Sequence, residues 1–168
     1  MALVTGNTNI RISKDRLERQ FRKMCRAPKT GGAEDEEDIK SKAEKPFGFM
    51  YNLFFWAVVL GANDNKMSPI EGSTDSPFRW VMIPDEMKRK LEAIALYFII
   101  FDEDKEKELK NAENFLSETD EEITERVRVV LEQLANRGLE LIDMEAETER
   151  PDAYSTVENL IDTINMYN

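Results

Sequence analysis

The chain contains no histidine, and its single cysteine is Cys25. The lack of histidine excludes Ser-His-Asp and Cys-His catalytic arrangements, and every metal site that needs an imidazole ligand. One cysteine can form neither an internal disulfide nor a thiolate zinc site, so we expect a reducing, cytoplasmic setting. The phosphate-binding patterns GxxxxGK[ST] and GxGxxG are also missing. We therefore expect a protein that is not an enzyme and needs no cofactor.

Long hydrophobic runs are scarce as well. The most apolar run, residues 49–60, contains Asn52 and is shorter than the roughly 20 residues that a membrane-spanning helix needs. The first ten residues lack the basic and long apolar regions of a secretory signal peptide. We therefore expect no membrane partner and interpret residues 47–60 as a buried helix.

The composition is that of a globular protein with an uneven charge. Of 168 residues, 41% are hydrophobic and 34% are charged, which is enough apolar material for a hydrophobic core. The net charge is -11, yet residues 11–29 hold eight basic and two acidic residues, so this segment is +6 and the remainder is -17. Such asymmetry predicts an acidic partner for the basic segment.

Shifts in composition divide the chain into three segments. Residues 1–30 form a basic N-terminal arm, residues 31–45 an acidic linker, and residues 46–168 a helical core domain. Within the arm, Ser13 can cap a helix that runs to about residue 26. Its apolar positions share one face and are Leu17, Phe21 and Met24.

The core segment predicts several helices and two short strands. Gly61 and Gly138 suit positions just past the ends of two helices, and Thr119 with Glu122 forms a capping box at the start of the second. The strands are expected at residues 78–83 and 139–144, paired with each other. The further helices are expected at residues 85–101 and after the Ser155 capping box.

The expected fold class is therefore mainly α: a helical domain with a small two-stranded β element and a basic N-terminal helical arm. Together with the helix at residues 121–135, the strand pair permits a winged-helix-like arrangement.

Three carboxylates are a candidate metal site. Asp143, Glu145 and Glu147 alternate and would lie on one face of the predicted strand, where carboxylate oxygens can hold Mg²⁺ for a nuclease. A solvated strand face explains the same pattern, and we favour it. Residues 84–88 (PDEMK) match the letters of the PD-ExK nuclease motif, but they overlap at the start of a predicted helix. Residues 63–74 begin like a calcium-binding loop but lack its glycine and its final glutamate. We assign no metal to either.

A basic stripe on the first helix is the main candidate binding site. It consists of Arg16, Arg19, Lys23 and Arg26, which share a face at three- and four-residue spacing. Such a stripe can bind DNA phosphates. It can equally bind an acidic protein groove, or pair with the acidic body of the same chain. The sequence leaves these three interpretations open.

The helix at residues 91–101 is a second candidate surface. Residues 94–101 are apolar all round, so this helix is either fully buried or turns one face toward another subunit. Burial is the simpler interpretation, and a homo-oligomer is the alternative.

Several blocks carry a family resemblance. Residues 47–61 (FGFMYNLFFWAVVLG) are followed by residues 66–70 (KMSPI), and later by residues 134–141 (LANRGLEL), while residues 13–21 open the chain with SKDRLERQF. Over roughly residues 10–145 the chain resembles a small DNA-phosphorothioation (Dnd) system-associated protein 4-like family. The resemblance implies an accessory protein of a DNA-modification or phage-defence locus and carries over no catalytic residue.

Two functions are consistent with these features. The first is a non-catalytic interaction subunit that docks onto larger protein subunits of a prokaryotic defence complex. The alternative is a direct DNA-binding module that uses the basic stripe.

Overall fold

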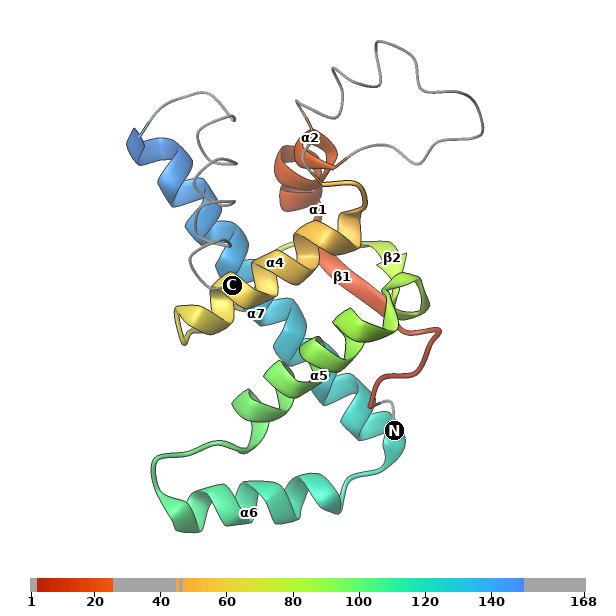
Figure 1. The fold of residues 1–168 in the computed structure, drawn as a ribbon, viewed down its shortest axis with the longest axis vertical. Coiled ribbons are helices and arrows are strands. Elements are labelled where there is room, and N and C mark those ends of the chain that lie inside the picture. Colours follow the sequence, from red (N-terminus) through yellow and green to blue (C-terminus); the bar gives the residue numbers. More distant parts are fainter. Residues whose placement is uncertain (1–2, 26–44, 46, 150–168) are drawn as a thin grey trace.

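The computed structural model describes residues 3–25, 45 and 47–149, with side chains described through residue 144. The described chain is mainly helical and contains one two-stranded antiparallel sheet (Figure 1). The predicted fold class, a mainly α domain with a small β element, is therefore confirmed. The capping box predicted at Ser155 lies outside the described residues.

The centre of the molecule is the crossing of α4, Met50–Asn63, with α7, Asp120–Glu149. These two helices make the most extensive contact between elements of the described chain, and Figure 1 shows α4 lying across the long α7. The α4 sequence is apolar almost all round, which explains why it is buried on several sides. Its buried residues are Leu53, Phe54, Phe55, Ala57, Val58 and Gly61.

Two glycines allow the backbones of α4 and α7 to approach closely. A Cβ atom at Gly61 would lie 2.0 Å from the backbone oxygen of Leu134, and a Cβ atom at Gly138 would lie 1.9 Å from that of Ala57. Neither distance is compatible with a side chain. The contact is therefore reciprocal: each helix presents a glycine to the backbone of the other.

Neither glycine ends a helix, so that prediction is wrong. Gly61 lies inside α4, and Gly138 lies in the middle of α7. A glycine inside a helix costs about 0.5–1 kcal/mol relative to alanine, and the close packing of two apolar helices more than offsets this cost. The strand predicted at residues 139–144 is also wrong. The helix α7 continues through these residues, and Leu139 and Ile142 are buried at helical spacing.

The sheet pairs β1, Asn9–Ser13, with β2, Thr74–Arg79. The alternation in β1 places Ile10 and Ile12 in the core. The pairing is irregular between these two residues. The pairing predicted between residues 78–83 and 139–144 is thus wrong, and so is the winged-helix-like arrangement built on it. After β2 the chain forms a single 3-10 turn, η2, Trp80–Met82.

A short helical segment follows β1 directly. It consists of α1, Lys14–Arg16, a π-helical turn η1, Leu17–Phe21, and α2, Arg22–Met24. Ser13 caps it, as predicted, by accepting a hydrogen bond from the Arg16 backbone N–H at 3.3 Å. The three apolar residues expected on one face of this helix are buried, namely Leu17, Phe21 and Met24.

The basic segment is not separate from the helical core. The sequence divided residues 1–30 from residues 46–168, yet Val4, Ile10 and Phe21 belong to the same buried cluster as α4 and α7. Hydrophobic burial explains the difference, because β1 and the segment after it cover apolar side chains of α7 that solvent would otherwise reach. The linker predicted at residues 31–45 lies almost entirely outside the described residues.

Buried carboxylates fasten the N-terminal segment to the helices. Glu132 of α7 accepts a hydrogen bond from the Arg11 backbone N–H at 2.7 Å and pairs with Arg128 at 2.7 Å. Burial raises the pKa of Glu132, although Arg11 and Arg128 act in the opposite direction. In the same way, Glu92 accepts hydrogen bonds from the backbone N–H groups of Leu3 and Val4.

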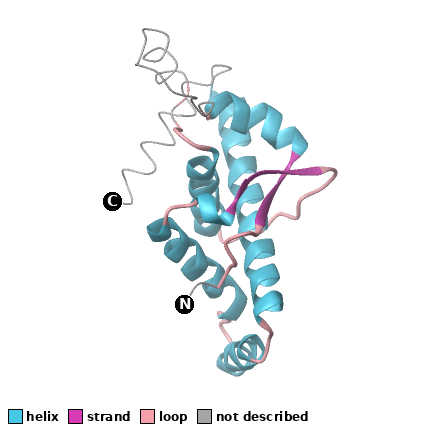
Figure 2. Cartoon of the chain, turned by 90° about the vertical axis from the view of Figure 1, so that its right-hand side faces the viewer, coloured by secondary structure: helices cyan, strands magenta, loops and turns pink. Residues whose placement is uncertain are grey.

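Two further helices complete the described chain. The first, α5, Asp85–Ile100, packs on α7 with Leu91, Ala95 and Ile99 buried. The second, α6, Lys105–Leu116, lies at one end of the molecule and packs mainly on α5 (Figure 2). Only Phe115 of α6 is buried. This end is therefore less covered than the crossing of α4 and α7.

Replacing Gly138 with alanine tests the close crossing. The added Cβ atom would overlap the backbone oxygen of Ala57, so we expect Gly138→Ala to lower the free energy of unfolding by at least about 2 kcal/mol. The matched control is Gly6→Ala, because a Cβ atom there would lie at an ordinary 3.7 Å from Val81. Urea unfolding followed by circular dichroism measures both. Equal stability of the two variants would contradict the crossing.

Candidate functional site

The basic stripe faces an acidic residue of the same chain. Arg16 donates to the Asp143 carboxylate at 2.5 Å, and Arg19 donates to Asp143 at 3.3 Å and also pairs with Asp15. Lys23 is exposed on α2, and Arg26 lies outside the described residues. The structure thus brings Arg16 and Arg19 together at one α7 carboxylate, which favours the intramolecular interpretation of these two residues.

Arg16 also lies in a polar junction between three parts of the chain. Its Nε donates to the Asn136 side-chain oxygen at 3.2 Å, and the Asn136 amide donates to the backbone oxygens of Ser68 and Pro69. The Ser68 hydroxyl donates to Glu140 at 2.8 Å. These side chains border a polar hollow of about 460 Å³. Each of them is used to join elements, so the junction is primarily structural.

Three of the four blocks that carry the family resemblance meet at this junction. Residues 13–21 supply Arg16, residues 66–70 supply the two carbonyl groups, and residues 134–141 supply Asn136. One set of contacts therefore joins three blocks that lie far apart in the sequence.

The candidate metal site at Asp143, Glu145 and Glu147 depended on a strand, which would place alternate residues on one face. All three residues belong to α7 instead, and the α-helical period does not bring residues two apart onto one face. Asp143 instead accepts hydrogen bonds from Arg16, Arg19 and Gln20. Within the residues described, no group of three His, Cys, Asp or Glu side chains is placed to hold a metal ion.

Cys25 is a buried packing residue. Its side chain is 3% exposed, and burial raises the pKa of the thiol to about 12. The thiol is therefore protonated at neutral pH and is a poor nucleophile.

Replacing Asp143 tests whether the basic stripe serves the fold. Asp143→Asn removes the charge that Arg16 and Arg19 share, so we expect the free energy of unfolding to fall by about 1–2 kcal/mol. Asp75→Asn is the control, because the exposed Asp75 carboxylate accepts a local hydrogen bond from the Ser76 backbone N–H and forms no ion pair within the described residues. Urea unfolding at low salt compares the two. If Asp143→Asn is as stable as the control, the ion pairs do not hold this segment.

The region best suited to a partner is at the opposite end of the molecule. It comprises residues 102–125, which include α6 and the first turns of α7, and we name it the acidic corner. It contains eleven acidic and three basic residues, a net charge of -8 out of -11 for the whole chain. The negative charge of the protein is therefore concentrated in one seventh of its length.

Large apolar side chains are exposed on and beside the acidic corner. Leu109 and Leu116 of α6 are 66% and 82% exposed. They are seven residues apart, so they lie on the same face of the helix. Tyr97 and Phe101, at the end of α5 that Asn111 of α6 contacts, are also exposed, and their rings stack with centroids 4.8 Å apart.

Specific contacts hold α6 in this position. Asp104 caps it by accepting a hydrogen bond from the Glu106 backbone N–H at 3.0 Å. The Asn111 amide donates to the Ile100 backbone oxygen at 3.3 Å, which joins α6 to the end of α5. Together with buried Phe115, these contacts fix the face that carries the exposed leucines outward.

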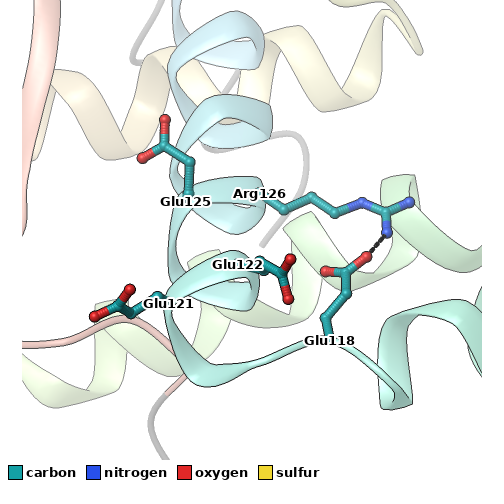
Figure 3. A pocket seen from close by; sticks show the side chains of 5 residues that line it. All are labelled: Glu118, Glu121, Glu122, Glu125 and Arg126. Atoms are coloured by element: carbon teal, nitrogen blue, oxygen red, sulfur yellow. Dashed lines mark hydrogen bonds and ion pairs between the residues drawn. The ribbon is translucent and has the colours of Figure 1, made fainter.

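A hollow of about 440 Å³ lies where α6 leads into α7. It is bordered by four carboxylates and one guanidinium, which are Glu118, Glu121, Glu122, Glu125 and Arg126. Figure 3 shows Arg126 extending from α7 to form an ion pair with Glu118 across the hollow. The hollow thus already accommodates one basic side chain.

The capping box predicted at the start of α7 is confirmed. The Glu122 carboxylate accepts a hydrogen bond from the Thr119 backbone N–H at 2.8 Å, and the Thr119 hydroxyl accepts one from the Glu122 backbone N–H at 3.4 Å. These bonds from Thr119 lower the pKa of Glu122 from its ordinary value of 4.5. The carboxylate is therefore favoured in the folded state.

The capping box predicts a pH dependence of stability. Because the folded pKa of Glu122 lies below 4.5, its stabilisation is present above the unfolded pKa and is lost as the pH falls through the folded pKa. We expect the difference in unfolding free energy between wild type and Glu122→Gln to be constant near neutral pH and to shrink below about pH 4.5. Urea unfolding across this range measures it. A difference that does not change with pH would contradict the role of the charge.

The acidic corner is not among the sites that the sequence predicted, although the negative charge of residues 102–125 is visible in the sequence. Leu109 and Leu116 look like core residues of an amphipathic helix, since their spacing is helical. Only the packing of α6 through Phe115 shows that they face outward.

No family model, curated protein or solved structure matches the chain. The family resemblance therefore stays a prediction. In the part of the chain that is described, no helix combines the length and the apolar character needed to cross a bilayer.

Proposed function

We propose that the chain is a non-catalytic interaction subunit that docks onto a larger protein through the acidic corner. The observation that carries this proposal is the outward position of Leu109 and Leu116 on a helix that is itself fixed to the body. Exposed apolar side chains that gather at one place mark interaction surfaces more often than scattered ones do.

The adjoining aromatic residues strengthen this proposal. Tyr97 and Phe101 stack on each other beside α6, so both rings are held in place before a partner binds. Aromatic anchors of this kind provide much of the binding energy in protein interfaces, and anchors ordered in advance lose less entropy on binding.

The resemblance suggests the setting of the partner. It implies a larger subunit of a prokaryotic DNA-modification or phage-defence complex in the cytoplasm. Direct DNA binding through the basic stripe has less support, because Arg16 and Arg19 already donate to Asp143. The acidic corner would also repel the phosphate backbone.

A pull-down from the native source tests the proposal. We compare the tagged wild-type chain with a Leu109→Ser, Leu116→Ser variant, with and without nuclease. We expect the wild type to recover a protein partner that resists nuclease, and the leucine variant to recover at least about tenfold less, since two apolar anchors are lost.

The matched control is a Val81→Ser, Met82→Ser variant. These two side chains lie in η2 and are 52% and 53% exposed, so the change removes similar apolar groups elsewhere. The control should recover as much partner as the wild type. If the leucine variant recovers as much partner as the control, docking through the acidic corner is wrong. Recovery of nucleic acid alone, released by salt, would support direct DNA binding instead.

A further inference from the structure

We infer that the partner segment bound by the acidic corner is basic and amphipathic, with aliphatic side chains that meet Leu109 and Leu116 and lysine or arginine side chains around them. This inference rests on the proposed function and specifies the chemistry of the partner.

Apolar and acidic side chains share one exposed face of α6. Leu109, Glu113 and Leu116 follow one another at four- and three-residue spacing, so a carboxylate stands between the two leucines. Any partner that covers the leucines must also contact Glu113. A basic group satisfies this carboxylate, whereas a purely apolar surface would leave it buried without a partner.

Two carboxylates of the acidic corner have no ion-pair partner among the residues that the structure describes. Lys105 pairs with Glu108, and Lys107 lies 4.0 Å from Asp104. Within the described chain, by contrast, Glu113 and Glu121 form no ion pair and are exposed. Their charges are therefore available to a partner.

The hollow in Figure 3 adds a second indication of a basic partner. Arg126 pairs there with one oxygen of Glu118. Glu121 also borders the hollow and is exposed. Its carboxylate can therefore accept a hydrogen bond from a basic side chain that a partner places in the hollow.

Charge also decides against other occupants of this surface. A second copy of the chain would bring a net charge of -8 against an equal charge, which opposes a dimer through this face. Nucleic acid and anionic bilayers are repelled for the same reason. A basic protein segment is the occupant whose charge and apolar groups both fit.

Binding of synthetic peptides tests the inference directly. The probe is a fluorescent 18-residue peptide with leucines at helical spacing and lysines at the other positions, and its counterpart carries glutamates in place of the lysines. Fluorescence anisotropy measures binding to the full chain at low and moderate salt. We expect only the lysine peptide to bind, with an affinity that falls as salt rises.

Two charge variants separate the acidic corner from net charge alone. Glu113→Lys with Glu121→Lys reverses two charges of the acidic corner, and we expect binding about tenfold weaker. Glu71→Lys with Asp75→Lys makes the same change in net charge at exposed positions elsewhere, and it should weaken binding less than about twofold. Equal weakening by both variants, or equal binding of the glutamate peptide, would overturn the inference.

The same charge variants in the pull-down distinguish the inference from the proposed function. If the leucine variant loses the native partner while Glu113→Lys with Glu121→Lys retains it, the basic partner is wrong and the docking function stands. If the leucine variant retains the partner, the docking function itself is wrong. If the leucine variant and Glu113→Lys with Glu121→Lys both lose the partner, while Glu71→Lys with Asp75→Lys still recovers it, the docking function and the basic partner are both supported.

Discussion

The close crossing of α4 and α7 is the contact on which the other described elements depend. Gly61 and Gly138 each meet the backbone of the opposite helix, so both helices bring their full apolar surfaces together. Because the crossing uses the middle of α7, the remaining length of this 30-residue helix extends away from it. One part receives β1 and α5, and the other carries Asp143, to which the N-terminal helical segment is attached.

Buried polar groups then decide how the N-terminal segment is placed. Glu132 and Glu92 each accept hydrogen bonds from backbone N–H groups of the first eleven residues, which a peripheral strand would otherwise leave unpaired. Such charges are costly to bury and stabilise the fold only when their partners are correctly positioned. They therefore specify one arrangement of β1 on the helices. The same placement brings Arg16 to Asp143, so this residue of the basic stripe forms an intramolecular ion pair.

The most densely packed part of the described chain and its most acidic part lie in different places. The crossing of α4 and α7 is densely packed, whereas α6 buries only Phe115 and lies in the most acidic part of the chain. A helix held by one apolar anchor, a cap and an amide hydrogen bond can present its other faces to solvent. The proposed docking surface thus lies on a helix that contributes one buried residue to the core, and its two leucines are exposed to solvent.

Local patterns in the sequence were sufficient to predict the fold class, the helical cores of α4 and α5, the cap at Ser13 and the capping box at Thr119, because these depend on side chains within a few residues of each other. Tertiary structure alone decided the roles of Gly61 and Gly138, since a glycine that ends a helix and one that admits a neighbouring backbone look the same in a sequence. Pairing of β1 with β2 joins residues about 65 positions apart, which no local pattern reveals. The partner of Arg16 and the exposure of Leu109 were likewise decided by packing, because each depends on which distant surface covers the residue.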